Sequence, residues 1–204
     1  GGSLYAQSKG EGEKAVLAAF LSAMILRPSV IFGSEDRFFN RFGSMARLSP
    51  VLPVVGGNTL FQPVHVDDVA QAAVKGALRQ ASGIYELGGP EVASFRDLMA
   101  KMLVVIRRRR LVLNMPFFVA KIMATGLDFA SAVTLGLIPN KILTRDQVDS
   151  LKTDNVVAAG AKTFADLGIQ PTDMDSVLPE YLWCYRPSGQ YAAIKESAKN
   201  LRKA

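Results

Sequence analysis

Apolar and polar residues along the chain follow two periods, which predict helices and buried strands in turn. Residues 5–20 have a helical pattern, and residues 23–33 are a continuous apolar run that Pro28 interrupts and Gly33 closes. Such a run is typical of a strand buried on both faces of a parallel sheet. Because ligands bind beyond the carboxyl ends of these strands in open α/β sheets, the residues around Gly33 are candidates for a site.

A second helix is predicted over residues 36–48. At helical spacing, Phe38, Phe42 and Met45 fall on one side, and the arginines of this segment lie largely elsewhere. We expect these side chains to pack in the core, and the wall of a ligand cavity is the alternative.

Short strands with tight connections follow this helix. Residues 51–55 and 59–64 are rich in β-forming residues and flank Gly56-Gly57-Asn58, which predicts a short hairpin or a sharp loop. Two glycines alone are weak evidence for a phosphate cradle, so we interpret them as a turn. Another strand is expected over residues 84–88.

Several helices should begin at side chains that accept the first free backbone N–H groups. The expected starts are Asp67 or Asp68 for a helix through residue 78, Ser94 with Asp97, Thr144 with Gln147, and Thr172. Capping is preferred to catalysis for the two carboxylates at 67 and 68. Gly168 should end a short helix over residues 163–167.

The basic run at residues 107–110 leads directly into an apolar stretch. A solvated strand entrance explains the run, and binding to an anionic partner such as lipid headgroups is the alternative. Pro116 suits the first turn of a long apolar helix. Because Lys121 and Asp128 interrupt this helix, we expect it to dock on a partner or at a membrane interface rather than to span a bilayer.

Composition narrows the class of protein. Of 204 residues, 49% are apolar and 21% are charged, which is typical of a globular domain or part of a larger one. The net charge of +6 would suit an anionic partner. The sequence has no zinc-finger, RNP or homeodomain pattern, so we expect no nucleic acid as partner.

Cysteine and histidine are too few for metal or disulfide chemistry. Cys184 is the single cysteine, which excludes an internal disulfide, and its apolar neighbours predict a packed thiol. His65 is the single histidine, and we expect a buried or half-buried hydrogen-bonding residue rather than a general base. No metal site is expected.

Tyr5 and Lys9 stand four residues apart at the start of the first predicted helix, so they share one face. A lysine ammonium in this position favours the phenolate and lowers the tyrosine pKa. Such a phenol can act as general acid or base at a carbonyl or carbinol. A plain pair on a helix surface is the alternative.

The order of four segments resembles that of extended or atypical short-chain dehydrogenase/reductases, the class that includes nucleotide-sugar epimerases. The segments are Tyr5-x-x-x-Lys9, Leu26-Arg-Pro-Ser-Val-Ile-Phe-Gly33, Pro63-Val-His-Val-Asp-Asp-Val-Ala70 and Ile84-Tyr-Glu-Leu-Gly-Gly-Pro-Glu91. Residues 26–40, 139–148 and 166–172 are more closely similar to the NADPH-binding accessory subunits of respiratory complex I.

This resemblance, over residues 4–186, implies an α/β fold. It would comprise the C-terminal part of a Rossmann-like short-chain dehydrogenase fold plus a smaller, mostly helical α/β domain. Residues 1–50 and 64–90 would form the dinucleotide-binding part, residues 51–63 and 91–186 the smaller domain, and residues 187–204 a basic tail.

The resemblance also implies site residues. Tyr5 would face the nicotinamide as the family's catalytic tyrosine, and Lys9 would hold the nicotinamide ribose hydroxyls. The nicotinamide end would be lined, through backbone and apolar contacts, by Pro28, Ser29, Val30 and Ile31. The cavity where other members place substrate would be bordered by Phe38, Phe39, Gln62 and His65.

Two features of the family are missing from this sequence. One is the glycine-rich turn that seats the pyrophosphate on a helix N-terminus. The other is the serine or threonine that partners the tyrosine. We therefore expect a fragment without the first βαβ units, which binds NADPH or NADH weakly or not at all, whereas the full-length protein binds one of them.

Two functions follow from the resemblance. The first is an accessory, NAD(P)H-binding subunit whose partners are complex I subunits and, as a further candidate, the membrane surface. It would lie on the matrix side of the mitochondrial inner membrane or on the cytoplasmic face of a bacterial inner membrane. The alternative is an NAD(P)-dependent oxidoreductase or nucleotide-sugar epimerase/dehydratase that uses Tyr5 as acid/base. We favour the first function, because the closer resemblance is to that subunit.

Overall fold

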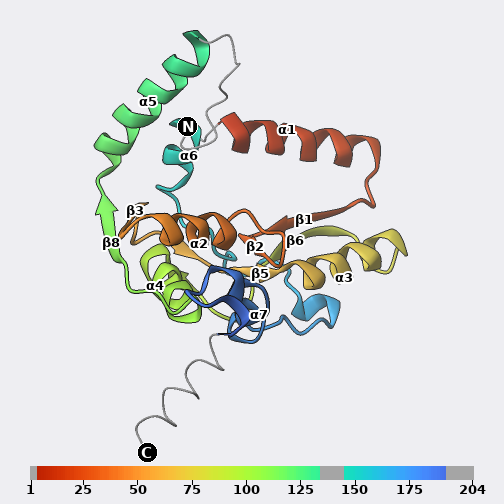
Figure 1. Cartoon of the computed structure of the whole chain (residues 1–204). Coiled ribbons are helices and arrows are strands. Elements are labelled where there is room, and N and C mark those ends of the chain that lie inside the picture. Colours follow the sequence, from red (N-terminus) through yellow and green to blue (C-terminus); the bar gives the residue numbers. More distant parts are fainter. Residues whose placement is uncertain (1–3, 134–144, 192–204) are drawn as a thin grey trace, which may run out of the picture.

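Helices and strands alternate along most of the chain. The computed structural model describes residues 4–133 and 145–191 (Figure 1). The α-helices are α1 (Leu4–Ala19), α2 (Phe39–Leu48), α3 (Val66–Ala77), α4 (Phe95–Val105), α5 (Phe117–Val133), α6 (Arg145–Ser150) and α7 (Met174–Tyr181), and the 3-10 helices are η1 (Ala165–Leu167), η2 (Leu182–Tyr185) and η3 (Gly189–Tyr191). The strands are β1 (Met24–Pro28), β2 (Ile31–Phe32), β3 (Val51–Val55), β4 (Leu60–Phe61), β5 (Val64–His65), β6 (Gly83–Leu87), β7 (Ala93–Ser94) and β8 (Leu111–Met115).

Most strand pairs are parallel. In the described part of the chain, β1 pairs with β6, β2 with β5 and β3 with β8 in parallel, whereas β4 and β7 are antiparallel. In the longest of these ladders, Met24 lies opposite Gly83 and Pro28 lies opposite Leu87. Parallel neighbours need crossover connections, and helices supply them here. The α/β class predicted from the sequence is confirmed.

Of the two connections expected at Gly56, a short hairpin or a sharp loop, the structure has the sharp loop. Gly56 has a φ of +66°, and the Thr59 backbone N–H donates to the Gly56 carbonyl over 2.9 Å. A left-handed residue at this point turns the chain out of β3 without laying β4 beside it. The partner of β3 is instead β8, in the register Val51 to Leu111.

Two helix caps differ from the sequence expectation, and one agrees with it. Ser94 accepts the Asp97 backbone N–H at the start of α4, as predicted. Asp67 and Asp68 do not cap α3, whose N-cap is His65 without a side-chain bond. Asp173, not Thr172, caps α7 by accepting the Asp175 backbone N–H.

Asp68 explains both misplaced caps. Its carboxylate accepts the Thr172 backbone N–H over 2.7 Å and the Thr172 hydroxyl over 2.9 Å. Since Thr172 lies 104 residues further along the chain, no local pattern could reveal this bond. The expected cap at Thr144 lies outside the described residues.

Three smaller expectations concern the start of α2, the end of η1 and Cys184. Helix α2 begins at Phe39 rather than Asp36, although Asp36 accepts the Asn40 backbone N–H over 3.1 Å and so bonds its first turn. Gly168 has a φ of +62° and ends the turn η1, as predicted. The packed thiol is wrong: Cys184 is exposed and donates to the Tyr181 carbonyl.

Three apolar clusters hold the fold together. The largest joins α2, α4, α7 and β3 and contains Phe39, Leu98, Met102 and Leu178, all fully buried. A second packs α3 against β1 and β6 and against residues 164–169, and a third joins the end of β3 to α5 and α6. The largest cluster combines residues from both parts of the predicted domain division, which stays a prediction.

Helices α1 and α5 project from this body, and α5 packs on it through Ala120 and Ala124. In Figure 1, α1 lies above the strands and α5 rises away from β8. One tie between α1 and β1 is Glu13, whose carboxylate receives the Arg27 guanidinium over 2.6 Å. Among the described helices, none has the length and apolar character needed to cross a membrane.

Candidate functional site

A hollow of the described structure lies between the core and α5. Its volume is about 640 Å³, which is within the range of about 300 to 1,000 Å³ typical of small-ligand sites. Apolar side chains make most of its wall: Val30, Phe38, Phe42, Met45, Pro53, Val55, Phe61, Phe95, Met115, Met123 and Leu151. Polar residues border it as well, namely Arg41, Asp146, Gln147, Ser150 and Asn155. We call this hollow the apolar cavity.

One wall of the apolar cavity is a cluster of phenylalanines. The Phe38 ring lies 5.7 Å from the Phe42 ring and 5.3 Å from the Phe95 ring, and Phe95 lies 5.6 Å from Phe61. Edge-on and tilted contacts at these separations are favourable for aromatic rings. The aromatic residues of α2 therefore serve both roles left open by the sequence, since they pack together and also face the cavity.

A second hollow of about 210 Å³ opens at the carboxyl end of β1, where Pro28 and Ser29 line it. The Ser29 hydroxyl donates to the Asn155 carbonyl over 2.8 Å, and the Ser29 backbone N–H donates to the Leu87 carbonyl over 2.9 Å. Asn155 borders both this hollow and the apolar cavity. The turn at residues 28–30 is thus fixed between the two hollows.

Gln62 joins three segments near this turn. Its side-chain amide donates to the Gly89 carbonyl over 2.8 Å, and its carbonyl oxygen accepts the Val157 backbone N–H over 3.0 Å. The Gln62 backbone N–H donates to Asn155. Gln62 therefore holds the site together, and it is not part of the apolar cavity's lining.

The remaining predicted residues do not line the apolar cavity. Ile31 lines a third hollow of about 340 Å³ beside residues 32–37, and Phe39 is fully buried in the largest core cluster. His65 is half-buried, with its ring 5.4 Å from the Phe32 ring. Of the eight predicted nicotinamide and substrate residues, the structure brings Val30 and Phe38 into one cavity and Pro28 and Ser29 into its neighbour.

Sequence reasoning missed two tyrosines that bond to the start of α2 and to the segment before it. The Tyr181 hydroxyl donates to the Asp36 carboxylate over 2.5 Å, and the Tyr185 hydroxyl donates to Asn40 over 2.9 Å. Burial and the bond to Asp36 raise the pKa of Tyr181 far above its usual range. Tyr181 therefore stays protonated near neutral pH, and its bond links the end of α7 to the segment that precedes α2.

Tyr5 and Lys9 both lie on α1, at the helical spacing that the sequence predicts. The structure places the backbone of Tyr5 there, and its side chain is outside the described part. Lys9 is exposed. The Arg27 guanidinium beside Glu13 lowers the pKa of that carboxyl, which keeps the tie between α1 and β1 ionised near neutral pH.

The basic run is partly structural. The Arg108 guanidinium donates to the Tyr185 carbonyl and the Arg110 guanidinium to the Ala46 carbonyl, each over 2.7 Å. Burial and the neighbouring Arg110 and Arg47 lower the pKa of Arg108. Arg107 and Arg109 are exposed. A solvated strand entrance thus describes half of the run, and the other half joins β8 to α2 and η2.

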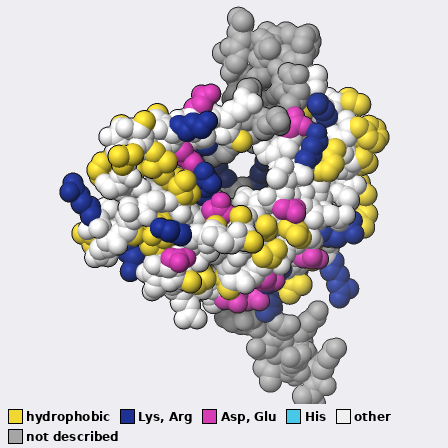
Figure 2. Space-filling model, turned by 180° about the vertical axis from the view of Figure 1, so that it is seen from behind, with side chains coloured by type: hydrophobic (Ala, Val, Ile, Leu, Met, Phe, Trp, Pro, Cys, Tyr) yellow, Lys and Arg dark blue, Asp and Glu magenta, His cyan; other side chains and the backbone are white. Residues whose placement is uncertain are grey.

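Charge and metal chemistry add little to the site. Figure 2 shows the face opposite to that of Figure 1. Acidic side chains there are interspersed with the lysines and arginines and leave no continuous basic patch. Within residues 4–133 and 145–191, no group of three or more His, Cys, Asp or Glu side chains is placed to hold a metal ion.

The parallel strands, their helical crossovers and the hollows at the strand ends define a Rossmann-like α/β protein. Residues 2–113 match the family model of the RmlD substrate binding domain. The chain belongs to this family.

Relatives and solved structures agree with this assignment. The chain is 37% identical over 188 residues to mitochondrial NADH dehydrogenase (ubiquinone) 1 alpha subcomplex subunit 9 of Arabidopsis thaliana, a match that covers 90% of this chain and 47% of the relative. It is 30% identical over 197 residues to the 40 kDa subunit of mitochondrial NADH-ubiquinone oxidoreductase of Neurospora crassa, covering 96% and 50%. The chain therefore spans about half the length of the curated relatives it matches.

Among solved structures, the chain is similar to dTDP-glucose 4,6-dehydratase of Bacillus anthracis in complex with NAD. The TM-score is 0.61 at 14% sequence identity, and the match covers 90% of this chain and 52% of that chain. At this identity the likeness concerns the fold alone.

Proposed function

We propose that this chain is part of an NAD(P)H-binding, short-chain-dehydrogenase-like accessory subunit of membrane-bound NADH:ubiquinone oxidoreductase, respiratory complex I. The observation that carries the proposal is the match along nearly the whole chain to subunits of that enzyme in a plant and a fungus. Its partners are then complex I subunits. Because both relatives are named as mitochondrial, we place the protein at the mitochondrial inner membrane, on the matrix side.

The turn at residues 28–31 supports a dinucleotide in the full-length protein. The Ser29 hydroxyl is already bonded to Asn155, so it is not turned towards a ligand. What the turn offers to a nicotinamide ring is backbone and the apolar surface of Pro28 and Val30. This fits the resemblance, which implies contacts of that kind. Lys9 would hold the ribose hydroxyls, and a bound NADPH or NADH would supply a hydride donor and stabilise the fold.

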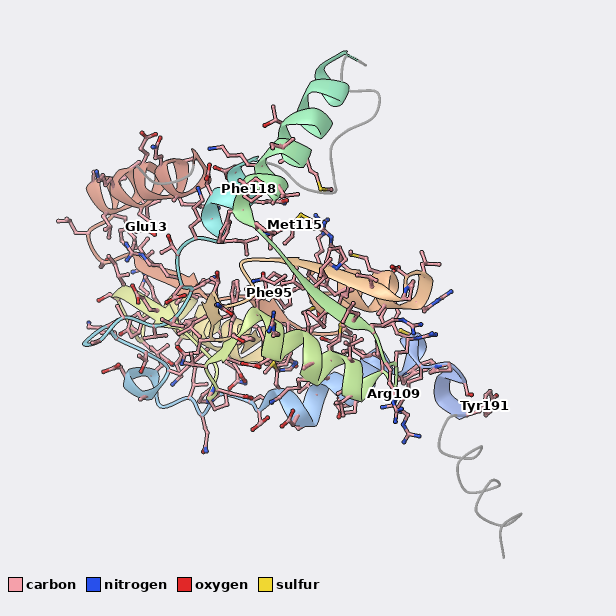
Figure 3. The ribbon with its side chains drawn as sticks, turned by 90° about the vertical axis from the view of Figure 1, so that its left-hand side faces the viewer. Glu13, Phe95, Arg109, Met115, Phe118 and Tyr191 are labelled. Atoms are coloured by element: carbon pink, nitrogen blue, oxygen red, sulfur yellow. The ribbon has the colours of Figure 1, made fainter. Side chains whose placement is uncertain are left out.

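Helix α5 supports a surface that docks on a partner. Phe118 and Ile122 are 67% and 70% exposed on it, and Leu113 of the adjoining strand is 52% exposed. Figure 3 shows Phe118 at the start of α5 and Arg109 at the far end of β8. The apolar helix and the basic run therefore lie at opposite ends of one strand. We assign the apolar face to a complex I subunit, and the membrane surface remains a second candidate for the basic run.

A variant that removes the phenol separates this function from the enzymatic alternative. In cells that carry Tyr5→Phe as their sole copy, we expect complex I to assemble at the wild-type level, because a structural subunit needs no acid/base at this position. Native gel electrophoresis of solubilised membranes with an NADH dehydrogenase stain measures it.

Substrate turnover that depends on the Tyr5 hydroxyl would contradict the proposal. If the purified full-length protein reduced or epimerised small carbonyl or sugar substrates, and Tyr5→Phe abolished that activity, the protein would be an NAD(P)-dependent oxidoreductase or epimerase. A Phe118→Asp variant is the matched control for assembly, since we expect it to weaken docking without touching the predicted dinucleotide residues.

A further inference from the structure

We infer that the apolar cavity binds the hydrocarbon chain of a single-chain amphiphile and not a nucleotide sugar. This deepens the proposed function by giving the class of ligand for the cavity beside the predicted nicotinamide residues. The inference rests on the proposed function only for the dinucleotide beside the cavity. The apolar lining itself is present without a dinucleotide.

The composition of the wall carries the inference. Of the residues that line the cavity, eleven are apolar, and they come from β1 to β2, α2, β3, β4, α4, β8, α5 and the end of α6. Wall residues this varied in position form a concave, partly open apolar site rather than the exposed face of one helix. Transfer of a hydrocarbon chain from water into such a site is favourable in proportion to the area it buries.

Charge argues against a nucleotide sugar. A diphosphate needs several cationic or N–H donors, because charged oxygens lose their hydration on binding. The lining has one cation, Arg41, and one anion, Asp146, which together give no net positive charge. The Arg41 guanidinium carbon also lies 5.9 Å from the centre of the Phe42 ring, against the aromatic wall.

The first turn of α2 offers no free anion site either. A helix N-terminus attracts phosphate through its unpaired backbone N–H groups. At this end, the Asp36 carboxylate already accepts the Asn40 backbone N–H and also the Tyr181 hydroxyl. A phosphate would meet a carboxylate there instead of free donors.

The polar end of the ligand has a place as well. Ser150 and Asn155 border the cavity, and Asn155 also borders the hollow at Pro28 and Ser29. If the ligand's hydroxyl, amide or carboxyl group lies at this rim, its hydrocarbon chain lies among the phenylalanines and Met115. Figure 3 shows Met115 between the body, where Phe95 lies, and α5. The head then points towards the predicted nicotinamide end.

Fluorescence titration of the full chain with cis-parinaric acid, without NADPH, tests the inference. We expect saturable binding, and displacement by geranylgeraniol distinguishes an isoprenoid from an acyl source. Met123→Trp on α5 and Ser150→Trp on α6 fill the cavity from two sides, and each should weaken binding at least about tenfold. Ile122→Trp is the matched control: it is the neighbouring residue, outside the lining, and should change the Kd less than about twofold.

The contrary results are equally defined. Absence of saturable binding, equal weakening by Ile122→Trp and Met123→Trp in proteins with wild-type circular dichroism, or displacement of cis-parinaric acid by UDP-glucose would overturn the inference. Since NADPH is left out, such a failure leaves the proposed dinucleotide and complex I functions untouched. Failure of those functions would appear in assembly, not in this titration.

Discussion

At the residue scale, the chain's polar side chains mostly hold backbone segments together. Asp68, Gln62 and Ser29 each bind groups far away in sequence, and each lies near the carboxyl ends of the strands. The sequence indicated this region as a candidate site, because apolar strands and their following turns are local patterns. It could not assign these bonds. An Asp68 that caps α3 and an Asp68 that accepts hydrogen bonds from Thr172 have the same local sequence.

Asp68→Asn tests the buried link to Thr172. The carboxylate is 2% exposed and accepts two bonds, so an amide in its place loses a charge-assisted acceptor and buries two unneeded donors. We expect the free energy of unfolding to fall by about 1 to 3 kcal/mol in urea titrations. Asp67→Asn, at the exposed neighbouring position, should change it by less than about 0.5 kcal/mol. Equal effects of the two variants would contradict the assigned role.

The Glu13 and Arg27 pair should make the docking of α1 depend on pH. Its bond to Arg27 lowers the pKa of Glu13 below the ordinary value of 4.5. A lowered folded-state pKa stabilises the docked form above that ordinary value, and this stabilisation is lost as the pH falls through the lowered pKa. Hydrogen-exchange protection of α1 should therefore decrease on acidification, relative to intrinsic exchange rates.

Substitution isolates this titration from general acid unfolding. In Glu13→Gln, protection of α1 should already be low at neutral pH and should lose the acid-dependent step. Glu11→Gln on the same helix is the control and should keep the wild-type profile. An unchanged profile in Glu13→Gln would show that other contacts hold α1.

At the scale of elements, close approach of backbone segments shapes the ends of the strands. A Cβ on Gly89 would lie 2.0 Å from the Pro63 carbonyl oxygen, and the Gly89 backbone N–H donates to Gln62. The sequence predicted the strand that ends there, and the helix after it through Ser94 and Asp97. It did not predict that β3 pairs with β8, because the partners Val51 and Leu111 lie 60 residues apart, with α3, β6 and α4 between them. Pairing over such distances leaves no local signal.

Gly89→Ala should therefore be strongly destabilising. The methyl group meets a backbone carbonyl that Val64 and its neighbours hold in place, so relief requires a shift of the strand ends. We expect a loss of about 1 to 3 kcal/mol or more in thermal or urea unfolding. Gly126→Ala in α5 is the control, since its Cβ would meet nothing within 4 Å. That variant should be neutral or stabilising by up to about 1 kcal/mol, through the helix propensity of alanine. Similar losses at both positions would contradict this picture.

At the scale of the whole molecule, three apolar clusters join segments that lie far apart in sequence, between Met24 and Tyr185. The class of fold was predictable, because alternating helical and strand patterns and the four family segments are readable in order. The apolar cavity was not, since its wall combines residues from α2, β8 and α5 that meet only in the folded chain. Phe38 and Val30 were the two lining residues that the resemblance indicated.

The central claim is that the chain belongs to a structural subunit of complex I, and comigration tests it most directly. The endogenous protein is tagged, mitochondrial membranes are solubilised in digitonin, and native electrophoresis is followed by an NADH dehydrogenase stain and detection of the tag. We expect the tag to migrate in the stained complex I band and loss of the protein to reduce this band. A tag found entirely in a free, low-mass fraction, with the band unchanged in its absence, would contradict the account.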